Sequence, residues 1–187
     1  MAKILGISGS LRRASFNAAL LGAAAEVVPS GTTIEIASIR DIPLYDADLE
    51  AEQGVIAPVQ ALKQRIVDCD ALLIATPEYN NSIPGVLKNA IDWLSRPSTD
   101  IKRVFGGRPV AIFGASPGRG GTILSQTAWL PVLRTLGTLP WFGGRLQIAD
   151  ASHVFDAEGR IVDERIQAEL TRFVAGFAEF VARPRPS

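Results

Sequence analysis

Short runs of apolar residues alternate along the chain with longer stretches whose apolar residues recur at helical spacing. The short runs are typical of β-strands and cover residues 4–7, 33–36, 71–75, 110–113 and, more weakly, 146–149. The helical stretches each place apolar side chains on one face: Ile56, Val59, Leu62 and Ile66; Leu87, Ala90, Ile91 and Leu94; and Ile166, Leu170, Phe173, Phe177 and Val181. This alternation predicts an α/β protein whose helical stripes pack against a sheet.

Three of the predicted strands are almost continuously apolar, as a strand must be when helices cover both faces of its sheet. Right-handed crossovers then give a doubly wound, five-stranded parallel sheet with helices on both faces. Because ligands bind beyond the carboxyl ends of the strands in such sheets, the segments that matter most are residues 8–17, 77–84 and 114–122. We expect a single domain over residues 1–187, whose polar, proline-broken residues 183–187 form a frayed tail.

The composition narrows the classes of partner. The chain has 187 residues with 19 Lys and Arg against 19 Asp and Glu, so it lacks the basic stripe that a nucleic acid or an anionic membrane requires. No apolar run reaches the ~20 residues of a membrane span. The sequence holds one cysteine, Cys69, and one histidine, His153, too few for an internal disulfide or a structural zinc site. We therefore expect a cytoplasmic protein with no metal, nucleic-acid or membrane partner.

The segment after the first predicted strand, residues 8–17, offers hydroxyl groups and a guanidinium at the start of an alanine-rich helix. Ser10, Arg12, Ser15 and Asn17 can supply the donors that a terminal phosphate needs beside the unpaired N–H groups of a helix start. Taken alone, the loop also fits an ordinary turn with Ser15 as N-cap, but its position after the first strand favours the phosphate site. The loop matches neither G-x-G-x-x-G nor a P-loop, which favours a monophosphate over a pyrophosphate.

The most specific motif follows the third predicted strand. Residues 77–80 read Pro-Glu-Tyr-Asn, and residues 84–93 read Pro-Gly-Val-Leu-Lys-Asn-Ala-Ile-Asp-Trp. Together with Gly-Ser-Leu-Arg at 9–12 and Gly-Ala-Ser-Pro-Gly-Arg-Gly-Gly at 114–121, this motif resembles the NAD(P)H-dependent FMN reductase family, close to its soluble chromate and quinone reductases. The resemblance extends over residues 3 to about 149.

The resemblance implies a flavodoxin-like fold, FMN as cofactor and NADPH or NADH as reductant. It implies cofactor contacts in three groups: Ser10, Arg12, Ser15, Phe16 and Asn17 at the phosphate end; Pro77, Glu78, Tyr79 and Asn80 along the isoalloxazine ring; and Ser116 and Gly118 at the other edge of the flavin. It also implies ping-pong hydride transfer at flavin N5 with no catalytic side chain. The acceptor stays open between a quinone, an azo compound, a metal oxyanion such as chromate, and free flavin. From the residues alone, Glu78 also fits a solvated turn and Tyr79 a packing aromatic.

A serine hydrolase is one competing interpretation. Residues 114–118 match G-x-S-x-G around Ser116, and Asp150 and His153 follow in the chain order of an α/β-hydrolase triad. Pro117, however, has no backbone N–H to act as the expected oxyanion donor. Asp150 and His153 are also separated by only two residues, whereas a triad acid and base usually come from separate loops.

A flavodoxin-type electron carrier is a second alternative, because it would share the fold and bind FMN at the same place. Carriers that dock by electrostatic steering usually display a surface of one sign, and the balanced charge of this chain argues against that. A flavin-binding module without turnover is a third alternative.

The predicted helix over residues 84–94 suggests a partner. Its stripe of Leu87, Ala90, Ile91 and Leu94 can face the sheet, while Val86 and Trp93, with Asn89 between them, would leave a second surface exposed. An exposed apolar patch of this kind indicates an interface. We expect a homodimer or homotetramer with Trp93 buried between subunits.

Overall fold

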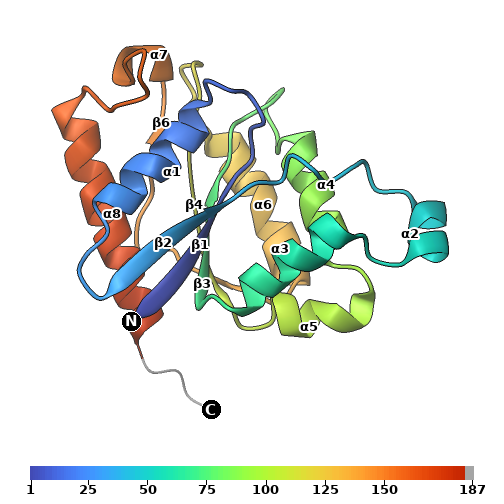
Figure 1. Ribbon diagram of the computed structural model, residues 1–187. Helices are drawn as coiled ribbons and strands as arrows, with labels where there is room; N and C mark the ends of the chain where they lie inside the picture. The colour runs from blue at the N-terminus through green and yellow to red at the C-terminus, as the bar shows by residue number, and fades with distance from the viewer. Residues whose placement is uncertain (184–187) are drawn as a thin grey trace.

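The computed structural model describes residues 1–183, and its strands form one parallel sheet between two layers of helices (Figure 1). The strands are β1 (Ala2–Ser8), β2 (Thr32–Ala37), β3 (Ala71–Ala75), β4 (Pro109–Ala115), β5 (Leu139–Pro140) and β6 (Gln147–Ile148). They lie in the order β2-β1-β3-β4-β5, with β6 also paired to β4. This is the flavodoxin-like order, in which the chain places β2 on one side of β1 and the later strands on the other, so that the switch point lies between β1 and β3. The predicted fold class is therefore confirmed.

The helices divide between the two faces of the sheet. They are α1 (Phe16–Glu26), α2 (Ala47–Gln53), α3 (Ala57–Val67), α4 (Gly85–Leu94), α5 (Ile101–Val104), α6 (Ile123–Thr135), α7 (Ala151–Val154) and α8 (Glu164–Ala182), with a 3₁₀ turn at Ser98–Asp100. α1 and α8 cover one face, and α3 to α6 cover the other (Figure 1). In β3, Leu73 points into the first core and Leu72 and Ile74 into the second. Burial on both faces explains why this strand is continuously apolar.

The outer edge beyond β4 differs from the single strand predicted at residues 146–149. β5 pairs with the start of β4, where the Trp141 N–H donates to the Val110 carbonyl at 2.8 Å, and the chain rejoins β4 where the Leu146 carbonyl accepts from Gly114 at 3.1 Å. Between these points, within the described residues, no hydrogen bond joins the Ile112 backbone to the intervening segment. The segment turns away because Trp141 packs edge-on against Phe173 of α8, at 5.1 Å between ring centroids.

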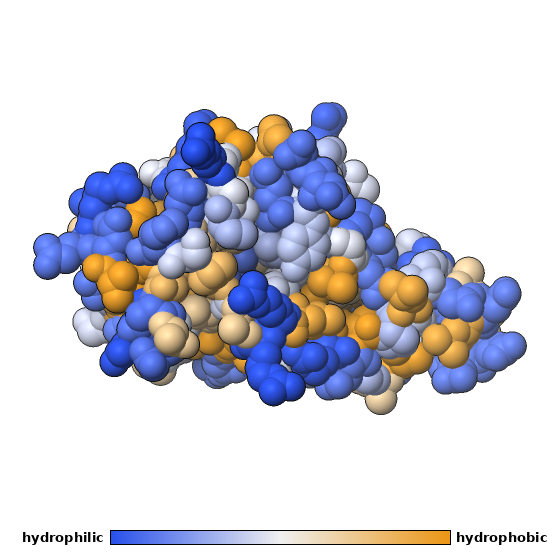
Figure 2. All heavy atoms as spheres, turned by 90° about the horizontal axis from the view of Figure 1, so that it is seen from above, coloured by the Kyte–Doolittle hydropathy of each residue, from blue (hydrophilic) through white to orange (hydrophobic). Residues whose placement is uncertain are grey.

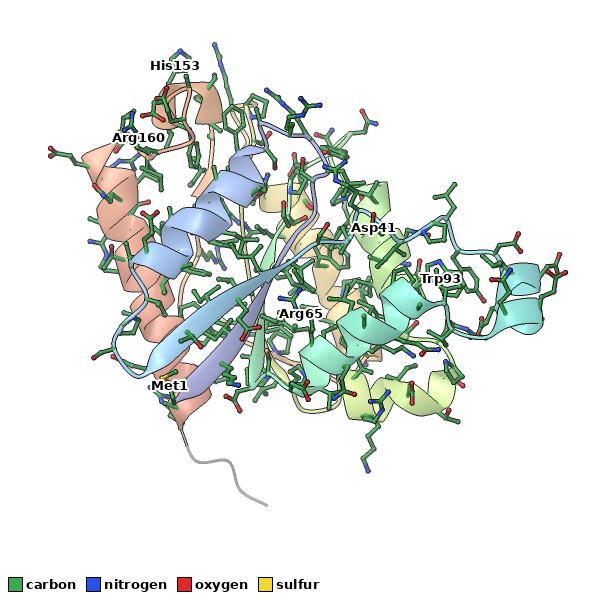
Figure 3. All side chains as sticks on the ribbon, viewed as in Figure 1. Met1, Asp41, Arg65, Trp93, His153 and Arg160 are labelled. Atoms are coloured by element: carbon green, nitrogen blue, oxygen red, sulfur yellow. The ribbon has the colours of Figure 1, made fainter. Side chains whose placement is uncertain are left out.

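An arm formed by residues 38–56, which includes α2, leaves the sheet after β2 and projects to the right in Figures 1 and 2. Its base is held by α4, because the side-chain N–H groups of Asn89 and Trp93 both donate to the Pro43 carbonyl, at 2.8 and 3.0 Å. Trp93 also meets the Tyr45 ring edge-on at 5.0 Å and is 0% exposed (Figure 3). The prediction that a second subunit buries Trp93 is therefore wrong, since the arm of the same chain covers it.

A second set of contacts ties α2 to the body. The Glu50 carboxylate accepts hydrogen bonds from the Tyr45 hydroxyl and from Nε of Arg96, each at 2.8 Å. These two hydrogen bonds lower the pKa of the Glu50 carboxyl and keep it charged against Arg96. The arm therefore has a fixed base, although none of the residues of α2 is itself buried.

Three expectations concern parts of the chain away from the sheet ends. Cys69 is buried, and burial raises the pKa of its thiol, so it behaves as a core side chain. Of the tail expected at 183–187, residues 184–187 lie outside the described residues. Within the described part of the chain, no helix has the length and apolar character needed to cross a membrane.

Candidate functional site

The loop between β1 and α1 presents a row of unused backbone donors. Within the described residues, the N–H groups from Arg13 to Asn17 have no hydrogen-bond acceptor. Ser10 Oγ accepts weakly from the Arg12 N–H at 3.4 Å, which folds the loop back on itself. Successive free amides at a helix start favour an anion, because the amide dipoles and the helix dipole act in the same direction.

The start of α1 is fixed by two side chains. Ser15 is the N-cap, and its Oγ accepts from the Ala18 N–H at 3.2 Å. Asn17 is buried, and its side-chain amide makes two hydrogen bonds with the backbone of Ala115 at the end of β4, at 2.8 and 3.0 Å. The Asn17 side chain is thereby engaged in the fold, so it is its backbone N–H that remains available to a ligand.

Arg12 and Arg40 bring positive charge to this loop. The Arg12 guanidinium lies 5.7 Å from the centre of the Phe16 ring, which stacks on Phe155. Arg40 follows β2, and its Nη2 donates to the Leu11 carbonyl at 2.5 Å. Sequence reasoning missed Arg40, although its place just after a predicted strand is a signal that could have identified it.

The loop after β3 is a rigid turn. Tyr79 and Ser82 exchange backbone hydrogen bonds of 3.1 and 3.0 Å, and Asn80 and Asn81 both have positive φ angles, of 49° and 61°. Two adjacent positive φ values are typical of a type I′ turn, a conformation that asparagine tolerates better than most residues. Within the described structure, the N–H groups of Glu78, Asn80 and Asn81 have no acceptor, so the turn offers several fixed donors.

Glu78 connects this turn to the helix that follows β4. Its Oε2 accepts from the backbone N–H groups of Leu124 and Ser125, at 2.9 and 3.1 Å. The N-cap residue of α6, Thr122, makes no side-chain capping bond, so Glu78 caps the helix from another loop. The alternative of a solvated turn side chain is therefore wrong, because the carboxylate accepts hydrogen bonds from the first turn of α6.

Close packing joins the three strand ends below these loops. The Thr76 hydroxyl lies 2.8 Å from that of Ser125 and accepts from the Trp129 indole at 3.0 Å, all in buried positions. A Cβ atom on Gly114 would lie 2.1 Å from the Thr76 carbonyl oxygen, and one on Gly9 would lie 3.0 Å from Pro77. Gly114 is required because neighbouring backbone approaches too closely for a side chain, and at Gly9 the side chains of Leu87, Pro77 and Pro84 occupy the space.

The loop after β4 does not assemble a hydrolase. Ser116 Oγ accepts from the Gly118 N–H at 3.2 Å, and the Gly118 carbonyl accepts from the Asp150 N–H at 3.3 Å. His153 is exposed on the outer side of α7 (Figure 3), and within the described residues its imidazole makes no hydrogen bond to Ser116 or Asp150. The triad interpretation therefore lacks both its contacts and its oxyanion donor.

The structure thus gathers most of the predicted site residues at one end of the sheet, which Figure 2 views from above. The loops after β1 and β3 meet where Gly9 packs against Pro77, and the loop after β4 is tied to both through Asn17 and Glu78. Tyr79 is 45% exposed at the rim and is not a packing aromatic. The arrangement can bind an anion at α1 and a planar polar group along the turn.

Comparisons with known proteins agree on one family. The family model described as NADPH-dependent FMN reductase matches residues 2–152. An NAD(P)H-dependent FMN reductase of Pseudomonas aeruginosa is 44% identical over 98% of this chain and 97% of its own, and a 2-hydroxy-1,4-benzoquinone reductase of a Burkholderia species is 41% identical over 96% of each. Among solved structures, the flavoenzyme NAD(P)H:(acceptor) oxidoreductase of Paracoccus denitrificans superposes with a TM-score of 0.85 at 33% identity, covering 97% of both chains.

Replacing Glu78 tests its role as a helix cap. We expect Glu78→Ala to lower the free energy of unfolding by about 1–2 kcal/mol, because two N–H groups of α6 lose their acceptor. Glu78→Gln retains an acceptor oxygen and should lose less. Urea unfolding measures the change, with Glu179→Ala on the exposed side of α8 as control, expected within about 0.5 kcal/mol of wild type. Equal effects of Glu78→Ala and the control would contradict the capping role.

Proposed function

Because the chain belongs to the NADPH-dependent FMN reductase family, we propose that it reduces quinones with electrons from NAD(P)H, passed through bound FMN. Family membership confirms the predicted oxidoreductase activity and the predicted dependence on FMN and NAD(P)H. The observation that carries the proposal is the pair of loops after β1 and β3, which meet at one end of the sheet and carry fixed backbone N–H groups that have no acceptor within the described residues. The quinone as acceptor is supported by the relative named for 2-hydroxy-1,4-benzoquinone.

The phosphate end of FMN fits the start of α1. The free N–H groups of Phe16 and Asn17 supply donors and the favourable end of the helix dipole. Arg12, whose guanidinium lies over the ring of Phe16, the first residue of α1, supplies the opposite charge, and Ser10 and Ser15 supply hydroxyl groups. A monophosphate needs donors that surround it in this way.

The ring end of FMN fits the turn after β3. When bound, FMN accepts a hydride from the nicotinamide and passes the electrons on to the acceptor. The amides of Glu78, Asn80 and Asn81 are held still by the type I′ turn and by the Glu78 cap, so they can stabilise the negative charge of a reduced flavin without rearranging. Ser116 and Gly118, which share a hydrogen bond in the loop after β4, would border the other edge of the ring. No side-chain acid or base is needed in this scheme.

The two other classes fit less well. A one-electron carrier that docks on a protein by steering needs a surface of one sign, and this chain carries 19 basic and 19 acidic residues. A hydrolase needs the contacts between Ser116 and His153 that the described residues lack.

The cytoplasm is the compartment we propose, because it supplies NAD(P)H and keeps a lone thiol such as Cys69 reduced.

Turnover with a quinone is the direct test of this function. The purified protein should show flavin absorbance and should oxidise NADPH when a benzoquinone is added. We expect Ser116→Ala to keep this activity within roughly tenfold, because Ser116 only borders the flavin. Serine-dependent cleavage of an activated ester by a protein free of flavin would instead identify a hydrolase.

The phosphate contact has a separate test. We expect Arg12→Ala to weaken FMN binding roughly ten- to a hundredfold, because a charge-assisted contact is worth about 1.5–3 kcal/mol. Riboflavin, which has no phosphate, should bind wild type and variant equally. Quenching of flavin fluorescence measures both dissociation constants, and an unchanged FMN constant would remove Arg12 from the site.

We further propose that the protein is a homodimer or homotetramer, and that the contact surface is the outer face of α6. Ile123, Leu130 and Phe142 are 46%, 40% and 73% exposed and line a groove of about 250 Å³ beside β5. Arg145 contributes the one charge among the lining residues. An apolar surface of this kind favours a partner, and the absence of net charge lets identical copies approach.

A charge placed on this face tests the assembly. We expect Leu130→Arg to shift the protein toward monomer in light scattering, because the guanidinium would lose its water in the interface. Val162→Arg is the matched control, since Val162 is 59% exposed on another surface and should leave the molar mass unchanged. A wild-type monomer at micromolar concentration would contradict the proposal.

A further inference from the structure

Three guanidinium groups surround the loop between β1 and α1. Arg12 and Arg13 lie within the loop, and Arg40 joins them from the end of β2. All three residues are exposed, and none forms an ion pair with a carboxylate of the described chain. The phosphate of FMN carries a charge of about −1.5 to −2, which Arg12 and the amides of α1 already match. The loop therefore carries more positive charge than one phosphate requires.

Arg40 is held on the outer side of this loop. Its Nη2 donates to the Leu11 carbonyl at 2.5 Å, and its backbone N–H donates to the Ser38 hydroxyl at 3.1 Å. The Leu11 carbonyl belongs to the same peptide unit as the Arg12 N–H, which donates to Ser10 Oγ and is not one of the free amides from Arg13 to Asn17. Arg40 is therefore bound to a part of the loop that precedes the amides assigned to the FMN phosphate. Asp41 follows in sequence at the same end of the sheet but makes no ion pair with Arg40 in the described structure (Figure 3).

Resting on the function proposed above, we propose that Arg40 binds a phosphate group of the nicotinamide dinucleotide. Hydride transfer requires the nicotinamide to lie against the open face of the flavin, so the rest of the dinucleotide passes over the loops at this end of the sheet. Both dinucleotides carry a pyrophosphate, and NADPH carries a further 2′-phosphate. The remaining donors of Arg40, Nε and Nη1, have no partner in the described residues, and a planar guanidinium suits a phosphate.

The experiment compares Arg40→Gln with wild type, both loaded with FMN. We expect the KM for NADPH and the dissociation constant for NADP⁺ from calorimetry to rise about tenfold, because one charge-assisted contact is lost. The FMN dissociation constant should stay within about twofold of wild type. Arg65→Gln is the matched control. The Arg65 side chain is 42% exposed and its Nη2 also donates to a backbone carbonyl, that of Ile36 at 3.1 Å, beside a surface ion pair with Glu35 on the flank of the sheet (Figure 3).

The pattern of losses identifies the phosphate involved. A loss confined to NADPH and NADP⁺ supports contact with the 2′-phosphate, and an equal loss for NADH and NAD⁺ supports contact with the pyrophosphate. Unchanged dinucleotide binding, or a loss matched by weaker FMN binding, would overturn the inference. A wild-type protein that binds no FMN would overturn the proposed function and this inference together, whereas full quinone reductase activity with unaltered dinucleotide constants in Arg40→Gln would overturn this inference alone.

Discussion

The two hydrogen bonds between the Asn17 side chain and the backbone of Ala115 determine where the first helix begins relative to the sheet. They join α1 to the end of β4, across the position where β3 ends. Both partners are buried, so an unpaired amide here would cost about 1–3 kcal/mol in lost hydration. Because α1 is held at this point, its free N–H groups lie at the end of the sheet beside the loop after β1. The anion site that we propose would thus be a consequence of how the fold satisfies a buried strand end.

The loops at this end of the sheet act as one unit for the same reason. Glu78 caps α6, the helix that follows a different strand. Beneath it, the Thr76 hydroxyl hydrogen-bonds to the Ser125 hydroxyl and accepts from the Trp129 indole. Each contact satisfies a polar group that burial or a helix end would otherwise leave unpaired. Donors fixed in this way need no rearrangement when charge develops on a ligand. The reaction scheme that we propose, in which no side chain acts as acid or base, depends on that rigidity.

Sequence patterns identified features that depend on neighbouring residues and missed those that depend on distant ones. The apolar runs and the position of loops after strands predict the sheet and its functional end, because both follow from local periodicity. The contact of Glu78 with α6 spans 46 positions, and no spacing rule reveals it. The sequence predicts a subunit interface at Trp93, because no local pattern reveals that residues 38–56 fold back over α4. The split edge beyond β4 depends on the packing of Trp141 against Phe173 of α8, a tertiary contact that the local sequence pattern does not reveal.

That split edge also affects how the protein avoids misassembly. A long, unpaired strand edge is a template on which another chain can add by backbone hydrogen bonding, and this leads to aggregation. Here β5 and β6 pair with the two ends of β4 and leave only the Ile112 backbone between them without a partner on that side of the described structure. One residue is too short a segment to start a new ladder. The outer strands β5 and β6 have only two residues each, so association at this edge depends mainly on side chains, whose shapes select their partners.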